Sequence, residues 1–248
     1  MDQPVLNRSL IAAGGIDAMV ARDAPDMRIL SEAERAASLR ATLDARPPGD
    51  VWLFGYGSLI WNPTIEAIER RTARIEGWHR AFCLSASVGR GSPENPGLVL
   101  GLDEGGDCTG VAFRIAEEVV EPELTLLWRR EMLSAAYEPQ WLDLLDGRGV
   151  QFARGIAFTI DRGTQHYAGG LAEEDVVRRL ATACGALGSA AEYLFHTCEG
   201  LRAHGIPDPV LELLEHRVHA AQGRGDARNI VSSVETEHPR SGRLCRSK

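Results

Sequence analysis

The sequence contains almost no lysine: among its 248 residues only Lys248 is one, and every other basic residue is an arginine. Without an interior lysine the chain cannot form a Schiff base with pyridoxal phosphate or with a carbonyl substrate. It also lacks the lysine with which a P-loop reaches a transferred phosphate. Lysine-dependent covalent catalysis and P-loop phosphoryl transfer are therefore excluded.

Long apolar runs, excess positive charge and paired cysteines are also missing. No apolar run approaches the roughly 18 residues of a membrane span. The formal net charge of −8 disfavours a general nucleic-acid binder, which needs a basic field. The five cysteines are widely spaced, without a zinc-ligand pattern, as expected in a reducing cytoplasm. We expect a cytoplasmic protein with neither nucleic acid nor membrane as partner, and the oligomeric state stays open.

The chain divides into three parts. Residues 1–50 are predicted to form a helical N-terminal extension and linker, with apolar spacing at Met27, Leu30 and Leu39 and a helix-stopping Pro-Pro-Gly-Asp at residues 47–50. Residues 51–222 are predicted to form one domain. Residues 223–248 are polar and arginine-rich, and are predicted to be a disordered tail.

Strand-like segments come first in the domain and helices come last. The strand-like segments are VWLFGY, RIEGWHRAFCLSAS, GLVLGLD, CTGVAFRI and QFARGIAFTI, and the predicted helices cover about 122–133, 173–184, 189–204 and 209–221. Because the two types are segregated and do not alternate, we predict an α+β domain with a largely antiparallel sheet or barrel rather than a doubly wound sheet.

The most unusual segment is FGYGSLIWNP, which follows an apolar strand from residue 54. A dinucleotide fingerprint would need glycine at Ile60, and a hydrolase nucleophile elbow would need glycine at both Tyr56 and Ile60. What remains is a turn whose backbone N–H groups and Ser58 hydroxyl could hold a carboxylate or a carbonyl oxygen. The alternative is a tight turn in which the glycines only satisfy backbone geometry.

Glu131 is a candidate general base because helical spacing places it on an apolar face. It lies one turn from Leu127 and two turns from Leu124, whereas Arg129 and Arg130 are predicted to point elsewhere. Burial raises a carboxyl pKa toward neutrality, which suits a group that accepts and returns a proton. The alternative is a structural ion pair with an arginine of a neighbouring strand, such as Arg80 or Arg114.

Several blocks together resemble the ChaC-like gamma-glutamylcyclotransferases, in their glutathione-specific branch. They are VWLFGYGSLIWNP, GRGSPENPGLVLGL, GDCTGVAFRI, LWRREMLSAAYEPQWL and AAEYLFHTCEGL, spread from Val51 to Ala220. The resemblance implies that residues 51–222 form a small mixed β-barrel with flanking helices, without cofactor or metal. It implies cleavage of glutathione to 5-oxoproline and Cys-Gly, by attack of the γ-glutamyl amine on its own side-chain carbonyl.

The resemblance also implies roles for individual residues. The catalytic general acid/base falls on Glu131, and the substrate-binding positions fall on Leu53, Phe54, Gly55, Tyr56, Gly57, Ser58 and Tyr193. Backbone N–H groups of the turn, as far as Leu59, would stabilise the developing oxyanion. Because glutathione is anionic, we expect Arg90 or Arg80 to bind its carboxylates, with a surface ion pair as the alternative for each.

Two alternative functions stay open. The true substrate could be another γ-glutamyl peptide or a γ-glutamylamine, because a backbone cradle contacts the γ-glutamyl half and leaves the other half loosely specified. A non-catalytic module that binds a metabolite in the same pocket is the second alternative.

Overall fold

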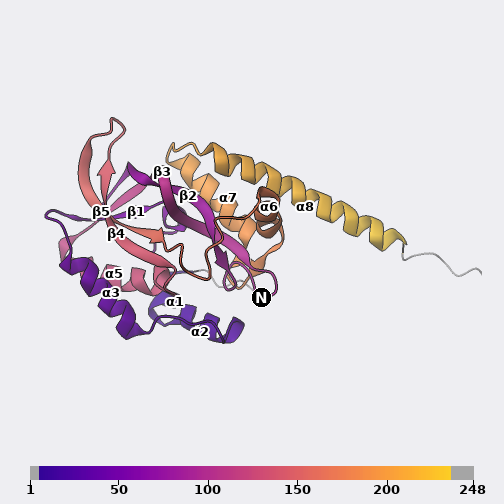
Figure 1. Cartoon of the computed structure of the whole chain (residues 1–248), viewed down its shortest axis with the longest axis horizontal. Coiled ribbons are helices and arrows are strands. Elements are labelled where there is room, and N and C mark those ends of the chain that lie inside the picture. The colour runs from indigo at the N-terminus through magenta and orange to yellow at the C-terminus, as the bar shows by residue number, and fades with distance from the viewer. Residues whose placement is uncertain (1–5, 236–248) are drawn as a thin grey trace, which may run out of the picture.

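A closed five-stranded β-barrel forms the centre of the computed structural model, which describes residues 6–235 and the side chains as far as residue 223 (Figure 1). The strands are β1 (Val51–Gly55), β2 (Glu69–Ala86), β3 (Gly97–Ile115), β4 (Tyr137–Leu145) and β5 (Gln151–Ile160), in the order β1-β3-β2-β4-β5. Strand β1 runs antiparallel to β3 and parallel to β5. The barrel is thus mixed, and the predicted α+β fold is confirmed.

Strand β3 combines two segments that the sequence predicted as separate strands. Gly105 and Gly106 adopt φ of 99° and 70°, and Gly77 on the facing strand β2 adopts φ of 82°. The register of the β2–β3 ladder shifts at this place, between Glu76 and Trp78. The glycines therefore form an irregularity within a continuous ladder and do not end the strand.

The helices lie on two sides of the barrel (Figure 1). They are α1 (Arg8–Ala12), α2 (Gly15–Asp23), α3 (Glu32–Asp44), α4 (Ser58–Trp61), α5 (Val120–Glu131), α6 (Glu173–Thr182), α7 (Ala190–Ala203) and α8 (Pro209–Glu235), with a 3-10 turn η1 (Glu117–Val119) and a small hairpin of β6 (Cys184–Gly185) and β7 (Gly188–Ser189). Helices α1–α3 gather around α5, and α6–α8 pack together on the other side. Within residues 6–235, no helix is long and apolar enough to cross a membrane.

Two helix boundaries differ from those predicted. Met27 and Leu30 lie in the connection between α2 and α3, beyond Pro25, rather than on a helix. Helix α8 continues to Glu235, so residues 223–235 are helical instead of belonging to the predicted disordered tail. No proline follows Pro209 until Pro239, so nothing removes a backbone donor along this helix. Residues 236–248 of the predicted tail lie outside the described residues.

The core joins the barrel interior to helix α5. Leu124 and Leu127 of α5 are fully buried, and the Trp128 ring meets Phe158 of β5 edge to face, with 5.2 Å between ring centroids. This packing faces the apolar stripe of α5 toward the barrel. The last residue of the helix, Glu131, is therefore directed inward.

Candidate active site

The two glycines around Tyr56 let the backbone approach its neighbours closely. A Cβ on Gly55 would lie 2.9 Å from Cε2 of Phe113, and a Cβ on Gly57 would lie 2.9 Å from the hydroxyl oxygen of Tyr193. The φ of Gly57 is −137°, so left-handed geometry is not the reason for a glycine there. The turn between β1 and α4 thus packs directly against Tyr193 of helix α7.

The Glu131 carboxylate is buried and incompletely paired. Its side chain is 14% exposed, and among the described residues no group donates a hydrogen bond to its Oε1. The Arg130 Nε lies 2.9 Å from this oxygen as an ion pair without hydrogen-bond geometry. Burial raises the pKa of Glu131, while the charge of Arg130 acts in the opposite direction. The alternative, an ion pair with an arginine of a neighbouring strand, is not what the structure shows, because Arg114 pairs with Glu69 and Arg80 pairs with Asp208.

Arg130 faces the site, contrary to the expectation that it points away from it. Its side chain is 4% exposed, and it donates hydrogen bonds to Ser58 Oγ at 2.7 Å, to Thr64 Oγ1 at 2.9 Å and to the Asn62 carbonyl. The segment from residue 58 to 64 packs over the end of α5 and supplies these acceptors. Arg130 therefore links the glycine turn to Glu131, a role that sequence reasoning missed although the two residues are adjacent.

Arg80 is a structural residue and not a substrate-binding one, which corrects the prediction. Its guanidinium donates to the carbonyl oxygens of Tyr56 and Thr109 and forms an ion pair with Asp208. Since Nε, Nη1 and Nη2 each already bind a protein acceptor, and Arg80 is not among the residues that line the pockets described below, it fixes the position of the turn rather than binding a ligand there.

The buried tyrosines Tyr56 and Tyr193 and the half-buried Tyr137 surround a small cavity of about 20 Å³ next to Glu131. The residues that line it are Tyr56, Ser58, Leu59, Leu100, Glu131, Tyr137, Phe158 and Tyr193. Tyr56 donates to the Phe158 carbonyl at 2.9 Å and Tyr137 donates to the Leu100 carbonyl at 2.7 Å, whereas Tyr193 accepts from Leu100 N at 3.4 Å. Burial raises the pKa of each phenol, so all three stay protonated. The hydroxyl proton of Tyr193 is thus placed to serve a ligand.

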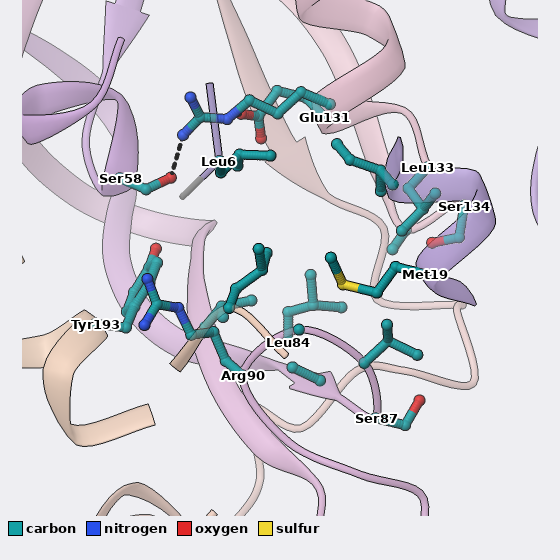
Figure 2. A pocket seen from close by; sticks show the side chains of 18 of the residues that line it. Leu6, Met19, Ser58, Leu84, Ser87, Arg90, Glu131, Leu133, Ser134 and Tyr193 are labelled. Atoms are coloured by element: carbon teal, nitrogen blue, oxygen red, sulfur yellow. Dashed lines mark hydrogen bonds and ion pairs between the residues drawn. The ribbon is translucent and has the colours of Figure 1, made fainter. Parts of the chain in front are cut away.

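The small cavity adjoins a larger pocket of about 400 Å³ (Figure 2). Ser58, Glu131, Tyr137 and Tyr193 line both spaces. Figure 2 shows Ser58 and Glu131 on one side of the pocket and Arg90 beside Tyr193 on another. A ligand that reaches Glu131 can therefore extend from the small cavity into the pocket.

Arg90 supplies positive charge to this pocket. Its side chain is 15% exposed, and its guanidinium lies 5.9 Å from the Tyr193 ring centroid. It makes a hydrogen bond of 3.3 Å to the Ser189 carbonyl and a long ion pair of 3.8 Å to Glu192. Burial lowers the pKa of Arg90. Because guanidinium carries five N–H donors, this arginine retains donors for a ligand carboxylate.

The structure separates the predicted site residues into two groups. Tyr56, Ser58, Leu59, Glu131 and Tyr193 meet at the small cavity, and Arg90 lies in the larger pocket. Of the other four, Gly55 and Gly57 form the turn, and the described residues that line either space include none of the four. Leu53 and Phe54 have fully buried side chains in β1. Their side chains therefore belong to the core, and they act by holding the turn in place.

Sequence reasoning gave no role to the N-terminal extension, yet four of its residues line the larger pocket: Leu6, Ile16, Met19 and Met27. The sequence predicted a helical extension from the spacing of Met27, Leu30 and Leu39, but this spacing did not indicate that the extension covers a pocket.

Chemically, the site combines a proton acceptor, neutral hydrogen-bond donors and a cation. Glu131 can take a proton, Tyr193 and the first N–H groups of α4 can donate hydrogen bonds, and Arg90 can bind an anion. Among the side chains that the structure describes, residues 6–223, no group of three or more His, Cys, Asp or Glu is arranged to hold a metal ion. The arrangement suits acid–base chemistry on a small anionic substrate.

Comparison with known proteins gives consistent matches. The model of the family described as ChaC-like protein matches residues 51–221. The glutathione-specific gamma-glutamylcyclotransferase of Escherichia coli K12 is 48% identical over 181 residues, which cover 72% of this chain and 77% of that protein. The glutathione-specific gamma-glutamylcyclotransferase 1 of Danio rerio is 30% identical over 66% of this chain and 87% of its own. The crystal structure of a yeast cyclotransferase specific to glutathione has the same fold, with a TM-score of 0.63 and 21% identity over 69% of this chain and 97% of that one.

Proposed function

The chain belongs to the ChaC-like protein family, and from this membership and the geometry of the site we propose that it is a glutathione-specific gamma-glutamylcyclotransferase. It cleaves glutathione to 5-oxoproline and Cys-Gly, with a cytoplasmic location as a further expectation. The observation that carries the assignment is the buried Oε1 of Glu131, which lacks a hydrogen-bond donor and faces the turn. The α-amine of a γ-glutamyl substrate is the donor that this oxygen needs.

Glu131 makes the amine nucleophilic. A free α-amine has a pKa of about 7.7–8.0 and is mostly protonated at pH 7, so attack requires a base. Glu131 takes one proton, and the amine nitrogen forms a bond to the γ-carbonyl carbon of the same glutamyl unit. Because this closes a five-membered ring, holding the arm bent supplies much of the catalysis. No nucleophilic side chain is needed, which agrees with the absence of an interior lysine.

The carbonyl oxygen becomes negative as the ring closes. The N–H groups of Ser58 and Leu59 open helix α4, and the Tyr193 hydroxyl lies against the same turn. These groups can stabilise the oxyanion, and losing one such donor typically raises a barrier by about 3 kcal/mol. Collapse breaks the bond to the cysteinyl nitrogen, and Glu131 returns its proton to that departing amine. The second proton, which the attacking nitrogen loses as it becomes the lactam N–H, passes through solvent to the same amine, so that Cys-Gly leaves as an ammonium. Arg90 binds a substrate carboxylate and so fixes the orientation.

A direct assay tests the proposal. The purified protein is incubated with glutathione, and 5-oxoproline and Cys-Gly are measured together. We expect both products in equal amounts. Binding of glutathione without either product would support the non-catalytic module instead. A higher kcat/KM for γ-glutamyl dipeptides or γ-glutamylamines than for glutathione would show that another γ-glutamyl compound is the substrate.

A further inference from the structure

The outer wall of the larger pocket comes from the N-terminal extension. Leu6, Ile16, Met19 and Met27 line the pocket together with Leu133, although the family model begins only at residue 51. In Figure 2, Met19 and Leu133 project into the pocket opposite Arg90 and Tyr193. These five side chains are apolar, whereas the charged and hydroxyl groups of the pocket, such as Glu131, Arg90 and Tyr193, come from other segments of the chain.

Hydrogen bonds fix helix α2 relative to the catalytic carboxylate. Arg35 of α3 is 3% exposed and contacts both carboxylate oxygens of Asp17 in α2, at 2.8 and 3.0 Å. The same guanidinium donates to the carbonyl of Met132, the residue after Glu131, at 3.2 Å. One buried arginine, Arg35, therefore holds both helix α2, which carries the pocket wall, and the backbone next to Glu131.

Two backbone contacts close the ends of the wall. The Leu30 N–H donates to the Leu133 carbonyl at 2.9 Å, and the Asn62 side chain donates to the Leu6 carbonyl at 2.8 Å. The extension is thus held on both sides of the pocket, at the segment that follows α5 and at the segment that follows α4. A wall held this way has a defined shape, which a ligand must match.

We propose that Met19 and Ile16 determine which leaving groups the enzyme accepts. This inference rests on the proposed function: with the γ-glutamyl half at Glu131 and the small cavity, the half beyond the scissile bond must lie in the larger pocket. There the thioether of Met19 and the side chain of Ile16 pack against the side chain of the cysteinyl residue. The N-terminal extension therefore limits the bulk that the substrate can carry on its sulfur.

The test compares two adjacent buried residues of α2. Met19→Ala shortens a side chain that lines the pocket. Val20→Ala shortens the neighbouring side chain, which is 2% exposed and is not among the pocket-lining residues. The two ligands are glutathione and S-butylglutathione. A pocket distinguishes one methylene by about 10-fold or more, so we expect Met19→Ala to raise the kcat/KM ratio of S-butylglutathione to glutathione about 10-fold. Val20→Ala should leave this ratio within about 2-fold.

Binding separates this inference from the proposed function. The same pair of substitutions is made in the Glu131→Gln protein, and the Kd of both ligands is measured by calorimetry, which needs no turnover. A change in the ratio of the two Kd values in Met19→Ala supports the proposed role of Met19 in ligand selection, even if the parent protein forms no 5-oxoproline. An unchanged ratio, an equal shift in Val20→Ala, or no binding of either ligand would overturn the inference.

Discussion

At the scale of single residues, the groups around Glu131 determine its acid–base chemistry. Glu131 ends a helix whose apolar face packs on the barrel, and none of the described residues donates a hydrogen bond to its Oε1. Three phenols, an ion pair and a turn without side chains at Gly55 and Gly57 complete the environment. Substitutions here should separate chemistry from folding.

Glu131→Gln should reduce kcat/KM for glutathione by about 10²- to 10⁴-fold, the usual contribution of a general base. Glutamine keeps the shape of the side chain but cannot accept the proton. The measurement is product formation at saturating and at limiting substrate, with circular dichroism as the control for folding. Activity within about 3-fold of the parent would contradict the role of Glu131.

The raised pKa of Glu131 also predicts how stability changes with pH. Because burial raises the folded-state pKa above the unfolded value, the native state binds the proton more tightly. The resulting stability is present at low pH and is lost as pH rises through the folded-state pKa. Relative to Glu131→Gln, the parent should lose free energy of unfolding between pH 4 and pH 8. The measurement is urea unfolding of both proteins across this pH range. If the difference between their free energies of unfolding does not change with pH, the pKa of Glu131 is not raised.

The contact between Gly57 and Tyr193 can be tested by a rescue. Gly57→Ala places a Cβ 2.9 Å from the Tyr193 hydroxyl and should lower the free energy of unfolding by about 1–3 kcal/mol. Adding Tyr193→Phe removes the clashing oxygen, so the double variant should regain part of this stability. Gly147→Ala is the control, because nothing lies within 4 Å of its added Cβ. If the double variant instead loses the sum of the free energies of unfolding that the two single variants lose, the two residues are not in contact.

Among the secondary-structure elements, α7 positions Tyr193 through its N-terminal cap. The Ser189 side chain accepts from Glu192 N at 3.1 Å, and the Glu192 side chain accepts from Ser189 N at 2.7 Å. Helix α3 has an equivalent capping box at Ser31 and Glu34, away from the small cavity. Within residues 6–235, one capping box therefore lies at the site and an equivalent one lies outside it, which allows a matched comparison.

Ser189→Ala and Ser31→Ala should each lower the free energy of unfolding by about 1 kcal/mol, the usual cost of a lost cap. Only Ser189→Ala should also lower kcat/KM, because Tyr193 lies in the first turn of α7. Guanidinium unfolding and steady-state kinetics measure the two effects. Equal kinetic effects of both substitutions would mean that the cap does not act through Tyr193.

In the molecule as a whole, arginines fasten the N-terminal extension to the domain. Arg8 of α1 contacts both carboxylate oxygens of Glu123 in α5, at 2.6 and 2.7 Å, and Arg129 donates to the Ala12 carbonyl at 3.1 Å. The planar guanidinium matches such bidentate contacts, which a lysine cannot make. The near absence of lysine thus has a structural counterpart in this interface.

Acid should loosen the extension before it unfolds the barrel. Burial alone would raise the pKa of Glu123, but the bond from Arg8 and the Glu66 N–H lower it overall. A carboxyl with a lowered folded-state pKa stabilises the fold above its unfolded pKa, and this contribution is lost as pH falls through the folded value. Hydrogen-exchange protection factors, which correct for the slower intrinsic exchange in acid, should therefore fall in residues 8–23 on acidification before they fall in the barrel. Glu123→Gln should show fast exchange already at neutral pH, and slow exchange there would contradict the prediction.

The sequence by itself determined the class of fold, the glycine turn and the inward direction of Glu131. These follow from short-range patterns: an apolar strand before two glycines, and residues one and two helical turns apart. The irregular but continuous strand β3 was not predictable, because Gly105 and Gly106 indicate a break unless the facing Gly77 is known.

Only the tertiary structure decided which charged groups remain available and what closes the pocket. Arg80 and Arg90 looked equivalent in the sequence, yet Arg80 is bound to two carbonyl groups and to Asp208, while Arg90 keeps donors for a ligand. Likewise, the sequence predicted a helical extension, but not that Ile16 and Met19 of this extension would line the pocket. Both outcomes depend on contacts between residues far apart in the chain, and periodicity along a sequence carries no information about such contacts.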